Sequence, residues 1–514
     1  MTARIPPVLR PEHPSARSLA GLVKDFGLDS VGSLDGVEVT GVTLSTTDLQ
    51  PGDLYVGIKG AHQHGAAFAA QAREGGAVAL LTDAAGAALA EGSGLPVVLV
   101  SSPREALGEI SAWVYRTAEH PPLLFGTTGT NGKTTTSYLL KAILTQLGLV
   151  AGLSSTAERH IGELTVVSRL TTPEASEMHA LLARMRESAV RAVAIEVSAQ
   201  ALSRNRVDGI VFDVVGFTNL SHDHLDDYAD MEEYFAAKLP LFQPDRAERG
   251  VVSLDSVWGQ RVVDESHIPV TTISATPSID AEWKVTIVDE QATYTGFTLT
   301  GPENRSLTTR VPLIGWHMAA DAGLAIVMLV EAGFELEAIG QALDEKGGID
   351  AYLPGRTERV SGDRGPSVFV DFGHSPDAFL NTLAAVRKFT PGKTIMVFGA
   401  DGDRDATKRH EMGRVAADGS DILVVTDHHP RFENPAAIRA TLIEGARLAE
   451  HQPELLEVSP PEAAIRAAVA LAGEGDSILW AGPGHQDYRD IEGVRTPYSA
   501  RDEARAALRE AGWE

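Results

Sequence analysis

The sequence predicts an α/β protein of three domains, and three observations lead to this prediction. At 514 residues the chain is too long for one hydrophobic core, because a prior of roughly 150 residues per domain suggests about three. Short apolar segments alternate with segments of helical spacing, which is typical of mainly parallel, doubly wound sheets. Pro121-Pro122 marks one boundary, and a new series of strands follows Leu353. We therefore expect domains at residues 1–119, 120–350 and 351–514.

Apolar segments give the expected strands of each domain. In the first domain they are Val37–Leu44, Leu54–Ile58, Ala77–Leu81 and Leu95–Val100. In the second they are Leu123–Phe125, Ala192–Ile195 and Ile210–Val215, followed by a more antiparallel stretch at residues 251–313. In the third, Rossmann-like domain they are Val368–Val370, Ile395–Phe398, Ile422–Val425 and Ile478–Trp480. Ligands of such sheets bind beyond the carboxyl ends of the strands, so the loops there should form the site.

The composition disfavours several classes of protein. A formal net charge of −26 disfavours nucleic-acid binding, because such proteins usually display a basic surface. No apolar run reaches the roughly 18 residues that could span a bilayer, and the N-terminus lacks the apolar core of a signal peptide. The absence of cysteine excludes disulfides and thiolate metal sites. We expect a cytoplasmic protein and, by default, a monomer with mobile domains.

A glycine-rich loop between an expected strand and an expected helix predicts phosphate binding. Its candidate residues are Gly129, Thr130, Asn131, Gly132, Lys133, Thr134 and Thr135. The glycines let successive backbone N–H groups face one anion, and the helix adds its positive end. Lys133 can reach the β- and γ-phosphates of a nucleotide, and the Thr134 hydroxyl can bind Mg²⁺. The alternative is a chance Gly-Lys-Thr on a surface turn, since Thr127 stands where the strict pattern has glycine.

The longer string Thr-Gly-Thr-Asn-Gly-Lys-Thr-Thr, at residues 128–135, resembles the Mur ligase family, which builds the peptide of bacterial cell-wall precursors. The segment Glu-Val-Ser-Ala-Gln-Ala-Leu, which starts at Glu196, is similar to a second family motif, with Ala199 and Gln200 replacing its Ser and His. The resemblance covers nearly the whole chain. It implies an ATP- and Mg²⁺-dependent ligase that joins an amino acid to a carboxylate through an acyl phosphate.

Four residues are the candidates for catalysis. Glu196 ends an expected strand near the phosphate loop, where a carboxylate suits a second Mg²⁺, although a helix cap or a solvated acid would also fit. By resemblance, His224 contacts the metal or a phosphate, and Lys238 carries a carbamate that binds the metal. From the residues alone, His224 would be a surface or hydrogen-bonded residue, and Lys238 would lie on an amphipathic helix with its amine extended to water. The fourth candidate is Lys133.

The resemblance implies that the carboxylate substrate is UDP-N-acetylmuramoyl-L-alanyl-D-glutamate. Its UDP-sugar would bind the N-terminal domain at Leu44, Thr46, Ala61, His62 and Gln63. Thr171 and Thr172 match a substrate-contact loop of the enzymes that add the third amino acid. Ser198, Arg204 and Arg206 would hold the acidic peptide, because a guanidinium can grip a carboxylate in two places. Surface salt bridges are the alternative for both arginines.

The third domain would bind the incoming amino acid. By resemblance its contacts are Arg404, His428, His429, Arg431, Gly482 and Gln486. Relatives place two acidic residues near a distal ammonium of the amino acid, and this sequence has His428 and Gln486 at those positions. Asp427, one residue before His428, is a candidate to take over the role of the missing acids. The third amino acid therefore stays open among meso-diaminopimelate, lysine, ornithine, diaminobutyrate and homoserine.

The nucleotide end of the site also departs from the family pattern. Residues 316–320 lie where relatives carry Phe-Asn-Val-x-Asn, so His317 could bind ATP in place of an Asn, but Ala320 could not. Three rivals are left open: the ligase that adds D-Ala-D-Ala, a folate polyglutamate ligase, and a nucleotide-binding regulatory partner with weakened catalysis.

Overall fold

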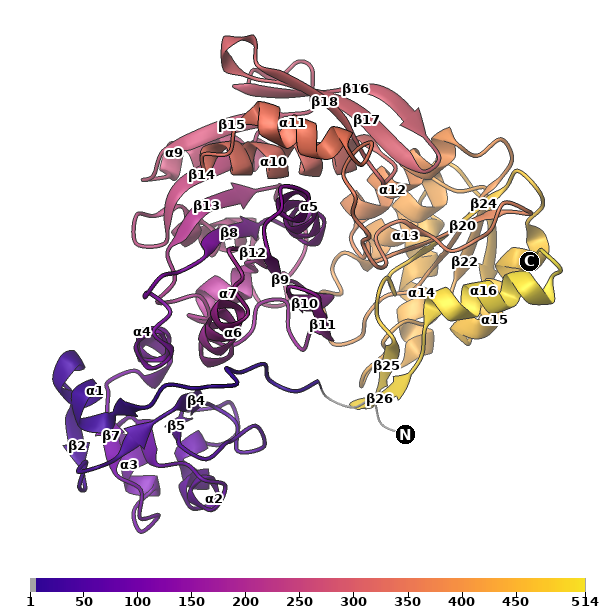
Figure 1. Cartoon of the computed structure of the whole chain (residues 1–514). Coiled ribbons are helices and arrows are strands. Elements are labelled where there is room, and N and C mark those ends of the chain that lie inside the picture. Colours follow the sequence, from indigo (N-terminus) through magenta and orange to yellow (C-terminus); the bar gives the residue numbers. More distant parts are fainter. Residues whose placement is uncertain (1–5, 514) are drawn as a thin grey trace.

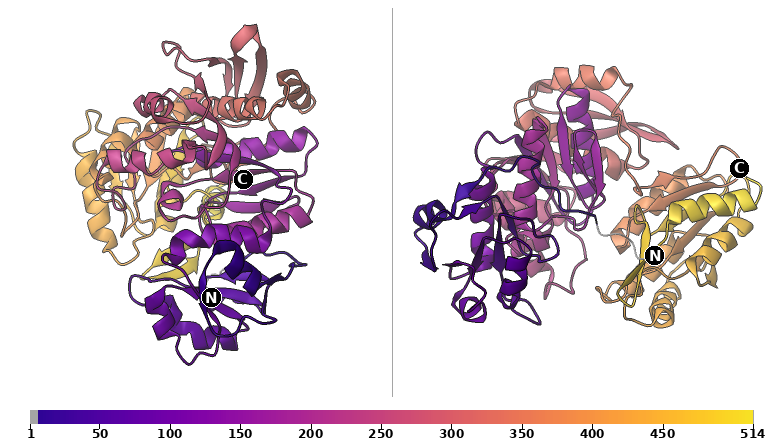
Figure 2. Two further views of the ribbon diagram at one scale, coloured as in Figure 1. Left: turned by 90° about the vertical axis from the view of Figure 1, so that its left-hand side faces the viewer. Right: turned by 60° about the horizontal axis from the view of Figure 1, so that its bottom comes forward.

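A computed structural model describes residues 6–513. Over this range the strands form three main sheets and two two-stranded ribbons. Figures 1 and 2 show the N-terminal sheet and the C-terminal sheet lying apart, each beside the large central one. No helix in the described range is long and apolar enough to cross a membrane.

The N-terminal sheet has five strands in the order β2-β7-β6-β5-β4, and only β2 runs antiparallel to its neighbour. Its strands and those of a ribbon pairing β1 with β3 are β1 (Arg17–Ser18), β2 (Asp29–Val31), β3 (Glu38–Val39), β4 (Gly41–Thr43), β5 (Asp53–Gly57), β6 (Ala79–Thr82) and β7 (Val97–Leu99). The helices are α1 (Leu19–Phe26), α2 (Ala69–Glu74), α3 (Ala84–Leu89) and α4 (Pro103–Tyr115), with a 3₁₀ turn η1 (Gly65–Phe68). The single strand expected at Val37–Leu44 is wrong, because β3 and β4 pair in different sheets.

The central sheet has the order β11-β10-β9-β12-β8-β13-β14-β15-β16-β17-β18. Its strands are β8 (Leu123–Thr128), β9 (Ala151–Ser154), β10 (Glu158–Ile161), β11 (Leu164–Val167), β12 (Ala192–Glu196), β13 (Phe212–Phe217), β14 (Ala247–Ser253), β15 (Val270–Ser274), β16 (Trp283–Gln291), β17 (Tyr294–Thr300) and β18 (Ser306–Val311). The run from β9 to β16 is parallel, and the two edges are antiparallel. The antiparallel stretch expected at residues 251–313 therefore starts only at the β16–β17 pair.

Helices cover this sheet because its inner strands are apolar on both faces. They are α5 (Lys133–Gln146), α6 (Ala175–Glu187), α7 (Ala199–Ser203), α8 (Met231–Ala236), α9 (Val257–Glu265), α10 (Trp316–Glu331) and α11 (Leu336–Asp344), with 3₁₀ turns η2 (Leu239–Phe242) and η3 (Pro302–Asn304). The helix α10 is buried along most of its length and packs on α5, β13 and β14 (Figure 1). Its N-terminal end therefore lies beside the loop that joins β8 to α5.

The C-terminal sheet has the order β19-β20-β24-β21-β22-β23, parallel except for β19. Its strands and those of the β25–β26 hairpin are β19 (Glu358–Arg359), β20 (Ser367–Asp371), β21 (Thr394–Phe398), β22 (Ile422–Val425), β23 (Glu454–Glu457), β24 (Ser477–Ala481), β25 (Tyr488–Ile491) and β26 (Val494–Pro497). The helices are α12 (Pro376–Lys388), α13 (Arg409–Asp418), α14 (Pro435–Ala446), α15 (Pro461–Leu471) and α16 (Ala500–Glu510). The α/β fold and the four predicted C-terminal strands are confirmed; β23 was missed because glutamates flank its two apolar residues.

Glycine lets α13 and α14 touch. A Cβ at Gly413 of α13 would lie 2.0 Å from the carbonyl oxygen of Leu442, and one at Gly445 of α14 would lie 2.0 Å from that of His410. Neither position has room for a methyl group, because in each case a backbone carbonyl of the facing helix occupies the space. The close approach of these helices therefore depends on both glycines.

We expect Gly413→Ala to destabilise the protein by about 1–3 kcal/mol, because the added methyl group must push two helices apart. Gly21→Ala in α1 is the matched control, since its Cβ would meet nothing closer than 3.7 Å. There the helix propensity of alanine should stabilise the protein by up to about 1 kcal/mol. Urea denaturation measures the free energy of unfolding of both variants. Equal changes of the same sign in Gly413→Ala and Gly21→Ala would contradict this account of the α13–α14 contact.

Candidate active site

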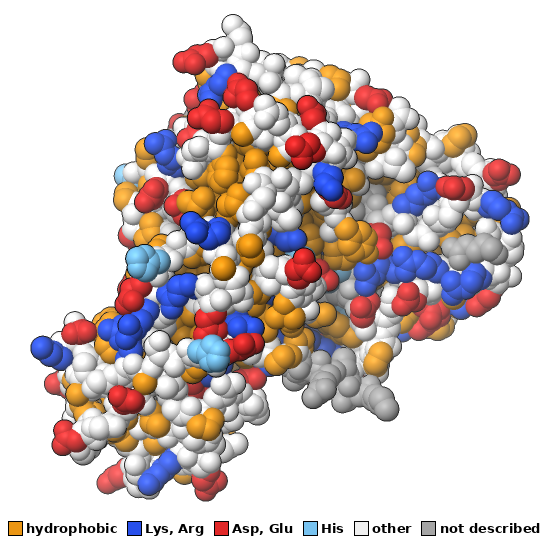
Figure 3. Space-filling view, in the orientation of Figure 1, with side chains coloured by type: hydrophobic (Ala, Val, Ile, Leu, Met, Phe, Trp, Pro, Cys, Tyr) orange, Lys and Arg blue, Asp and Glu red, His pale blue; other side chains and the backbone are white. Residues whose placement is uncertain are grey.

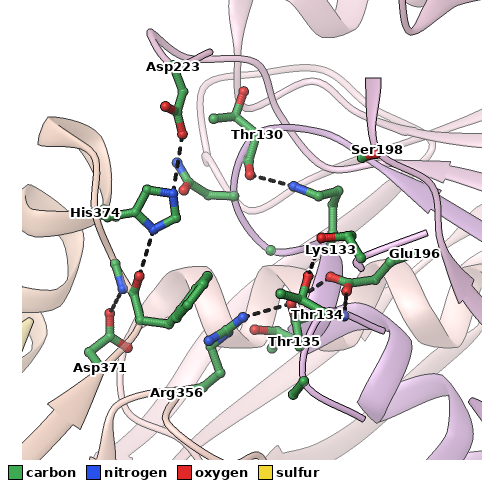
Figure 4. Close-up of a pocket in the computed structure, with 18 of the residues that line it drawn as sticks. Thr130, Lys133, Thr134, Thr135, Glu196, Ser198, Asp223, Arg356, Asp371 and His374 are labelled. Carbon is green, nitrogen blue, oxygen red and sulfur yellow. Dashed lines mark hydrogen bonds and ion pairs between the residues drawn. The ribbon is translucent and has the colours of Figure 1, made fainter. Parts of the chain in front are cut away.

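A cavity of about 970 Å³ lies where the loops of the central and C-terminal sheets face each other. Its walls include the phosphate loop, the loops after β12 and β13, the start of α10, and C-terminal loops after β20, β21, β22 and β24. On the face drawn in Figure 3, acidic and basic side chains are interspersed. Inside the cavity the charges are instead arranged in defined groups, several of which Figure 4 shows.

The phosphate loop is curled by two glycines. Gly129 and Gly132 have φ of 150° and 87°, and a Cβ at these positions would lie 1.9 Å from Thr218 Oγ1 and 2.5 Å from Asp321 Oδ1 respectively. Lys133 folds back over the loop, donating to the carbonyl oxygens of Gly129 (3.1 Å) and Thr130 (2.8 Å). Burial lowers the pKa of Lys133, while nearby Glu196 opposes that shift. The loop is thus closed around the lysine at the start of α5.

Asn131 and Thr135 complete the predicted phosphate loop. Asn131 donates its backbone N–H to the side-chain oxygen of Asn219 and its amide to Asp377 at 3.2 Å, which connects the loop to α12. Thr135 is buried in the first turn of α5 and lines the cavity. Six of the seven predicted loop residues, all but Gly129, therefore line the cavity.

Glu196 and Thr134 meet directly at the carboxyl end of β12. The Thr134 hydroxyl donates to Glu196 Oε1 at 2.6 Å and accepts from Arg356 Nη2 at 2.8 Å, as drawn in Figure 4. The second carboxylate oxygen of Glu196 accepts from the backbone N–H of Thr156. Glu196 is fully buried, which excludes the solvated acid, and the N-cap of the following helix α7 is Ser198, which excludes the helix cap. Two hard oxygen donors therefore lie side by side next to the phosphate loop, which suits Mg²⁺.

Lys238 is buried behind the phosphate loop, which corrects the expectation of an amine extended to water. Its Nζ donates to the carbonyl oxygen of Gly129 at 2.9 Å and lies 4.3 Å from the centre of the Tyr234 ring. The side chain follows α8, where the chain turns into η2, and it is 1% exposed. Burial and the neighbouring Lys133 hold the pKa of Lys238 well below its usual value. Its surroundings therefore favour the neutral amine over the ammonium.

His224 lies near the same lysines. Burial, together with Lys133 and Lys238, lowers the pKa of His224 to about 4, against the opposing effect of Asp223. The ring is thus neutral at pH 7 and carries a lone pair. Gln200, which stands in place of a family His, approaches His224 Nδ1 at 3.4 Å and donates to Asp227 at 2.8 Å.

Asp223 connects the central sheet to the C-terminal one. Its Oδ1 accepts from Lys408 at 2.6 Å, and its Oδ2 lies 3.6 Å from His374 Nε2. Burial favours the neutral acid, but His224, Lys408 and His374 together hold the pKa of Asp223 below its usual range. The same interface pairs Arg404 with Asp226 at 3.7 Å.

The predicted peptide-binding residues surround Glu196. Thr172 donates its hydroxyl to the carbonyl oxygen of Glu196 at 2.8 Å, and Thr171 accepts from the Thr156 hydroxyl at 3.0 Å. Ser198 caps α7 by accepting from the Ala201 N–H at 3.1 Å. Arg206 pairs with Glu174 at 2.9 Å, and Arg204 pairs with Asp227 at 3.3 Å. Thr171, Ser198 and both arginines line the cavity, while Thr172 lies behind it.

The predicted uridine residues lie elsewhere. None of Leu44, Thr46, Ala61, His62 and Gln63 lines the cavity. Leu44 and Thr46 follow β4, and Ala61–Gln63 follow β5 in an exposed turn. Because β4 and β5 are parallel neighbours, both loops leave the same edge of the N-terminal sheet. The structure therefore brings them near one another but not near the phosphate loop.

One expectation about the amino-acid end needs correction, and the nucleotide end contains a residue that the sequence did not point to. Asp427 does not line the cavity: it accepts from Arg439 and from the Ser459 hydroxyl. At the nucleotide end the polar side chain next to Gly132 is Asp321, one residue beyond Ala320. Burial raises the pKa of Asp321 well above its usual value, which favours the protonated carboxyl group, and in that form the group can donate a hydrogen bond as an amide does.

The other predicted residues of the amino-acid and nucleotide ends line the cavity or pack behind its wall. Arg404, His428, Arg431, Gly482 and Gln486 line the cavity, and His429 packs behind them. His317 lines it at the start of α10, where burial lowers its pKa to about 4 and leaves Nδ1 without a partner among the described residues. Four residues of the cavity wall had no role predicted from the sequence: Asp321, Arg356, His374 and Lys408. An acid within the apolar run of α10 was a signal for Asp321; the others needed the fold.

Comparisons with known proteins agree with this geometry. Family models described as "Mur ligase family, catalytic domain", "Mur ligase middle domain" and "Mur ligase, glutamate ligase domain" match residues 38–115, 127–329 and 355–484. The chain is 64% identical over 513 residues to the UDP-N-acetylmuramyl-tripeptide synthetase of Leifsonia xyli, covering 100% of both chains. It is 42% identical to the UDP-N-acetylmuramoyl-L-alanyl-D-glutamate–2,6-diaminopimelate ligase of Streptomyces avermitilis, covering 99% of both.

A solved structure of a UDP-N-acetylmuramoyl-L-alanyl-D-glutamate–2,6-diaminopimelate ligase shares the fold. Its TM-score is 0.66 at 24% identity, over 97% of this chain and 100% of the other. The resemblance stated from the phosphate-loop string is thereby confirmed. The chain belongs to the Mur ligase family.

Proposed function

We propose that this chain is an ATP-dependent ligase that adds the third amino acid to UDP-N-acetylmuramoyl-L-alanyl-D-glutamate, in the cytoplasm. The observation that carries the proposal is the single cavity in which the phosphate loop, the peptide-binding loops and the C-terminal loops face one another. The relative that is 64% identical over the whole chain is named for tripeptide synthesis. Three domains, at residues 1–119, 120–350 and 351–514, would bind the UDP-sugar, ATP and the amino acid respectively.

The reaction requires the protein to position the substrates, and it needs no nucleophile from the protein. A carboxylate oxygen of the dipeptide attacks the γ-phosphorus of ATP, and the bond to the β,γ-bridging oxygen breaks, which gives an acyl phosphate and ADP. The amine of the amino acid then attacks the acyl carbon, loses a proton, and expels phosphate. Lys133, the first residue of α5, and the N-terminus of that helix would bind the transferring phosphoryl group. Arg204 and Arg206 would hold the peptide carboxylates.

The oxygen donors fit a divalent cation. Thr134 and Glu196 would hold Mg²⁺ beside the phosphates, and the neutral ring of His224 can supply a nitrogen ligand. When bound, Mg²⁺ neutralises charge on the phosphoryl oxygens. Lys238 does not fit this set as an amine, because an ammonium would repel the cation.

Lys238 fits once it is carbamylated. Only a neutral amine attacks CO₂, and the lowered pKa of Lys238 supplies one. The new N–C bond gives a carbamate anion and releases one proton to solvent. The product is an anionic oxygen ligand beside the phosphate loop, where the amine now donates to Gly129.

A phosphate-release assay tests the proposed function. With ATP, Mg²⁺ and UDP-N-acetylmuramoyl-L-alanyl-D-glutamate, we expect phosphate release that depends on an added amino acid and yields a tripeptide product. Release with UDP-muramoyl-tripeptide and D-Ala-D-Ala, or with folate and glutamate, would instead support one of the two rival ligases. Nucleotide binding without turnover on any of these substrates would support a regulatory partner.

Carbamylation can be measured directly. Protein equilibrated with ¹³C-bicarbonate should show a carbamate carbon resonance by NMR that is absent from Lys238→Arg, because a guanidinium cannot form this adduct. Lys346→Arg, at an exposed lysine, is the matched control and should keep the signal. If wild type and Lys238→Arg give the same spectrum while the wild type is active, the carbamate is excluded.

A further inference from the structure

The amino-acid end of the cavity contains a carboxylate that the sequence analysis did not single out. Asp401 lies in the loop after β21 and lines the cavity with His428 and Arg431. Its Oδ1 lies 2.6 Å from His428 Nδ1, and its Oδ2 lies 3.3 Å from Arg431 Nη2. The side chain is 31% exposed. A carboxylate has about four acceptor positions, so these two contacts leave capacity for a ligand.

His428 offers a second acceptor beside Asp401. Because Nδ1 lies against a carboxylate, that nitrogen carries the hydrogen, and in the neutral ring Nε2 then holds a lone pair. Nε2 is buried and has no hydrogen-bond partner among residues 6–513. A buried polar atom without a partner costs free energy, so a ligand N–H that reaches it is favoured.

The neighbouring polar residues do not supply this acceptor. His429 Nδ1 accepts from the backbone N–H of Asp490 at 3.0 Å, so its Nε2 carries the hydrogen and donates to Gln486 Oε1 at 2.8 Å. Burial lowers the pKa of His429 to about 3, which keeps the ring neutral. The oxygen of Gln486 is therefore engaged, and Asp427 is paired with Arg439.

The two loops that present Asp401 and His428 are joined by hydrogen bonds. Gly402 donates its N–H to the carbonyl oxygen of His429 at 2.8 Å. The side chain of Arg409 donates to the carbonyl oxygen of Asp401 at 2.8 Å and to Glu433, in the loop after β22, at 2.8 Å. A Cβ at Gly402 would lie 2.0 Å from the Pro430 carbonyl oxygen. The two acceptors thus keep a fixed separation, as selection between similar ligands requires.

We propose that Asp401 and His428 Nε2 bind a second, distal ammonium group on the incoming amino acid, so that the enzyme selects a diamino acid. The proposal rests on the proposed function and deepens it. A desolvated ammonium needs an anionic partner or several acceptors. Asp401 supplies the anion, and His428 Nε2 supplies a further acceptor. Homoserine, whose hydroxyl carries no charge, is then a poorer substrate.

Matched pairs of amino acids test the proposal with the full-length enzyme, ATP, Mg²⁺ and UDP-N-acetylmuramoyl-L-alanyl-D-glutamate. The pairs are diaminobutyrate and 2-aminobutyrate, ornithine and norvaline, lysine and norleucine, and diaminopimelate and 2-aminopimelate. Within the preferred pair, the wild type should favour the diamino member in kcat/KM. Asp401→Asn should raise KM for that member by about 10- to 100-fold, as expected for one lost charge-assisted hydrogen bond, with little change in kcat.

The readout is the ratio of kcat/KM for the two members of a pair, because an effect of Asp401→Asn on Arg431 or His428 acts on both members and cancels in that ratio. The melting temperature of Asp401→Asn shows whether the variant is folded. Asp427→Asn removes an acid from the same pair of loops but outside the cavity, and it should keep the wild-type preference. His428→Phe, which keeps a ring but loses Nε2, should weaken the preference in the same direction.

The outcomes separate the two claims. Turnover without any preference for diamino acids, or an unchanged preference in Asp401→Asn, overturns this inference alone. No turnover with any amino acid overturns the proposed function, and this inference with it.

Discussion

The cavity depends on the curl of one backbone loop between β8 and α5. Two glycines allow the curl, and any side chain at either would collide with Thr218 or Asp321. Two lysine side chains brace the curled loop, because Lys133 and Lys238 both donate to its carbonyl oxygens, and Lys133 adds a positive charge there. In a chain with a net charge of −26, a polyphosphate can be held only by such a local arrangement. Glu196 and Thr134 then stand where a divalent cation would meet those phosphates.

The chemistry also requires the C-terminal sheet to reach the loop. Three contacts bring it there: Lys408 to Asp223, Arg356 to Thr134, and Asn131 to Asp377. All three involve polar groups that would otherwise face the substrates. Both side chains of the Lys408–Asp223 pair are buried, so separating the two sheets would leave each charge without its partner. The geometry of the interface and that of the cavity are thus set by the same residues.

Much of the fold could be predicted from the sequence, because its inner strands are short apolar runs between glycine-rich loops. The phosphate loop could be predicted because its strand, turn and helix are contiguous. Lys238 could not: its spacing is that of an amphipathic helix, and only the tertiary structure shows that η2 turns it inward behind Gly129. The contacts of Asp401 and Lys408 could not be predicted either, because their partners, His428 and Asp223, lie far away in the sequence.

One measurement tests the central claim most directly, namely that the loop around Lys133 holds the phosphoryl group as the substrate carboxylate attacks it. Single-turnover ADP formation can be followed in Lys133→Ala and in the wild type, each with saturating ATP and dipeptide substrate. The account predicts that the rate falls by at least about 100-fold, the scale of losing one preorganised charge at the transition state. An undiminished rate in Lys133→Ala would contradict it.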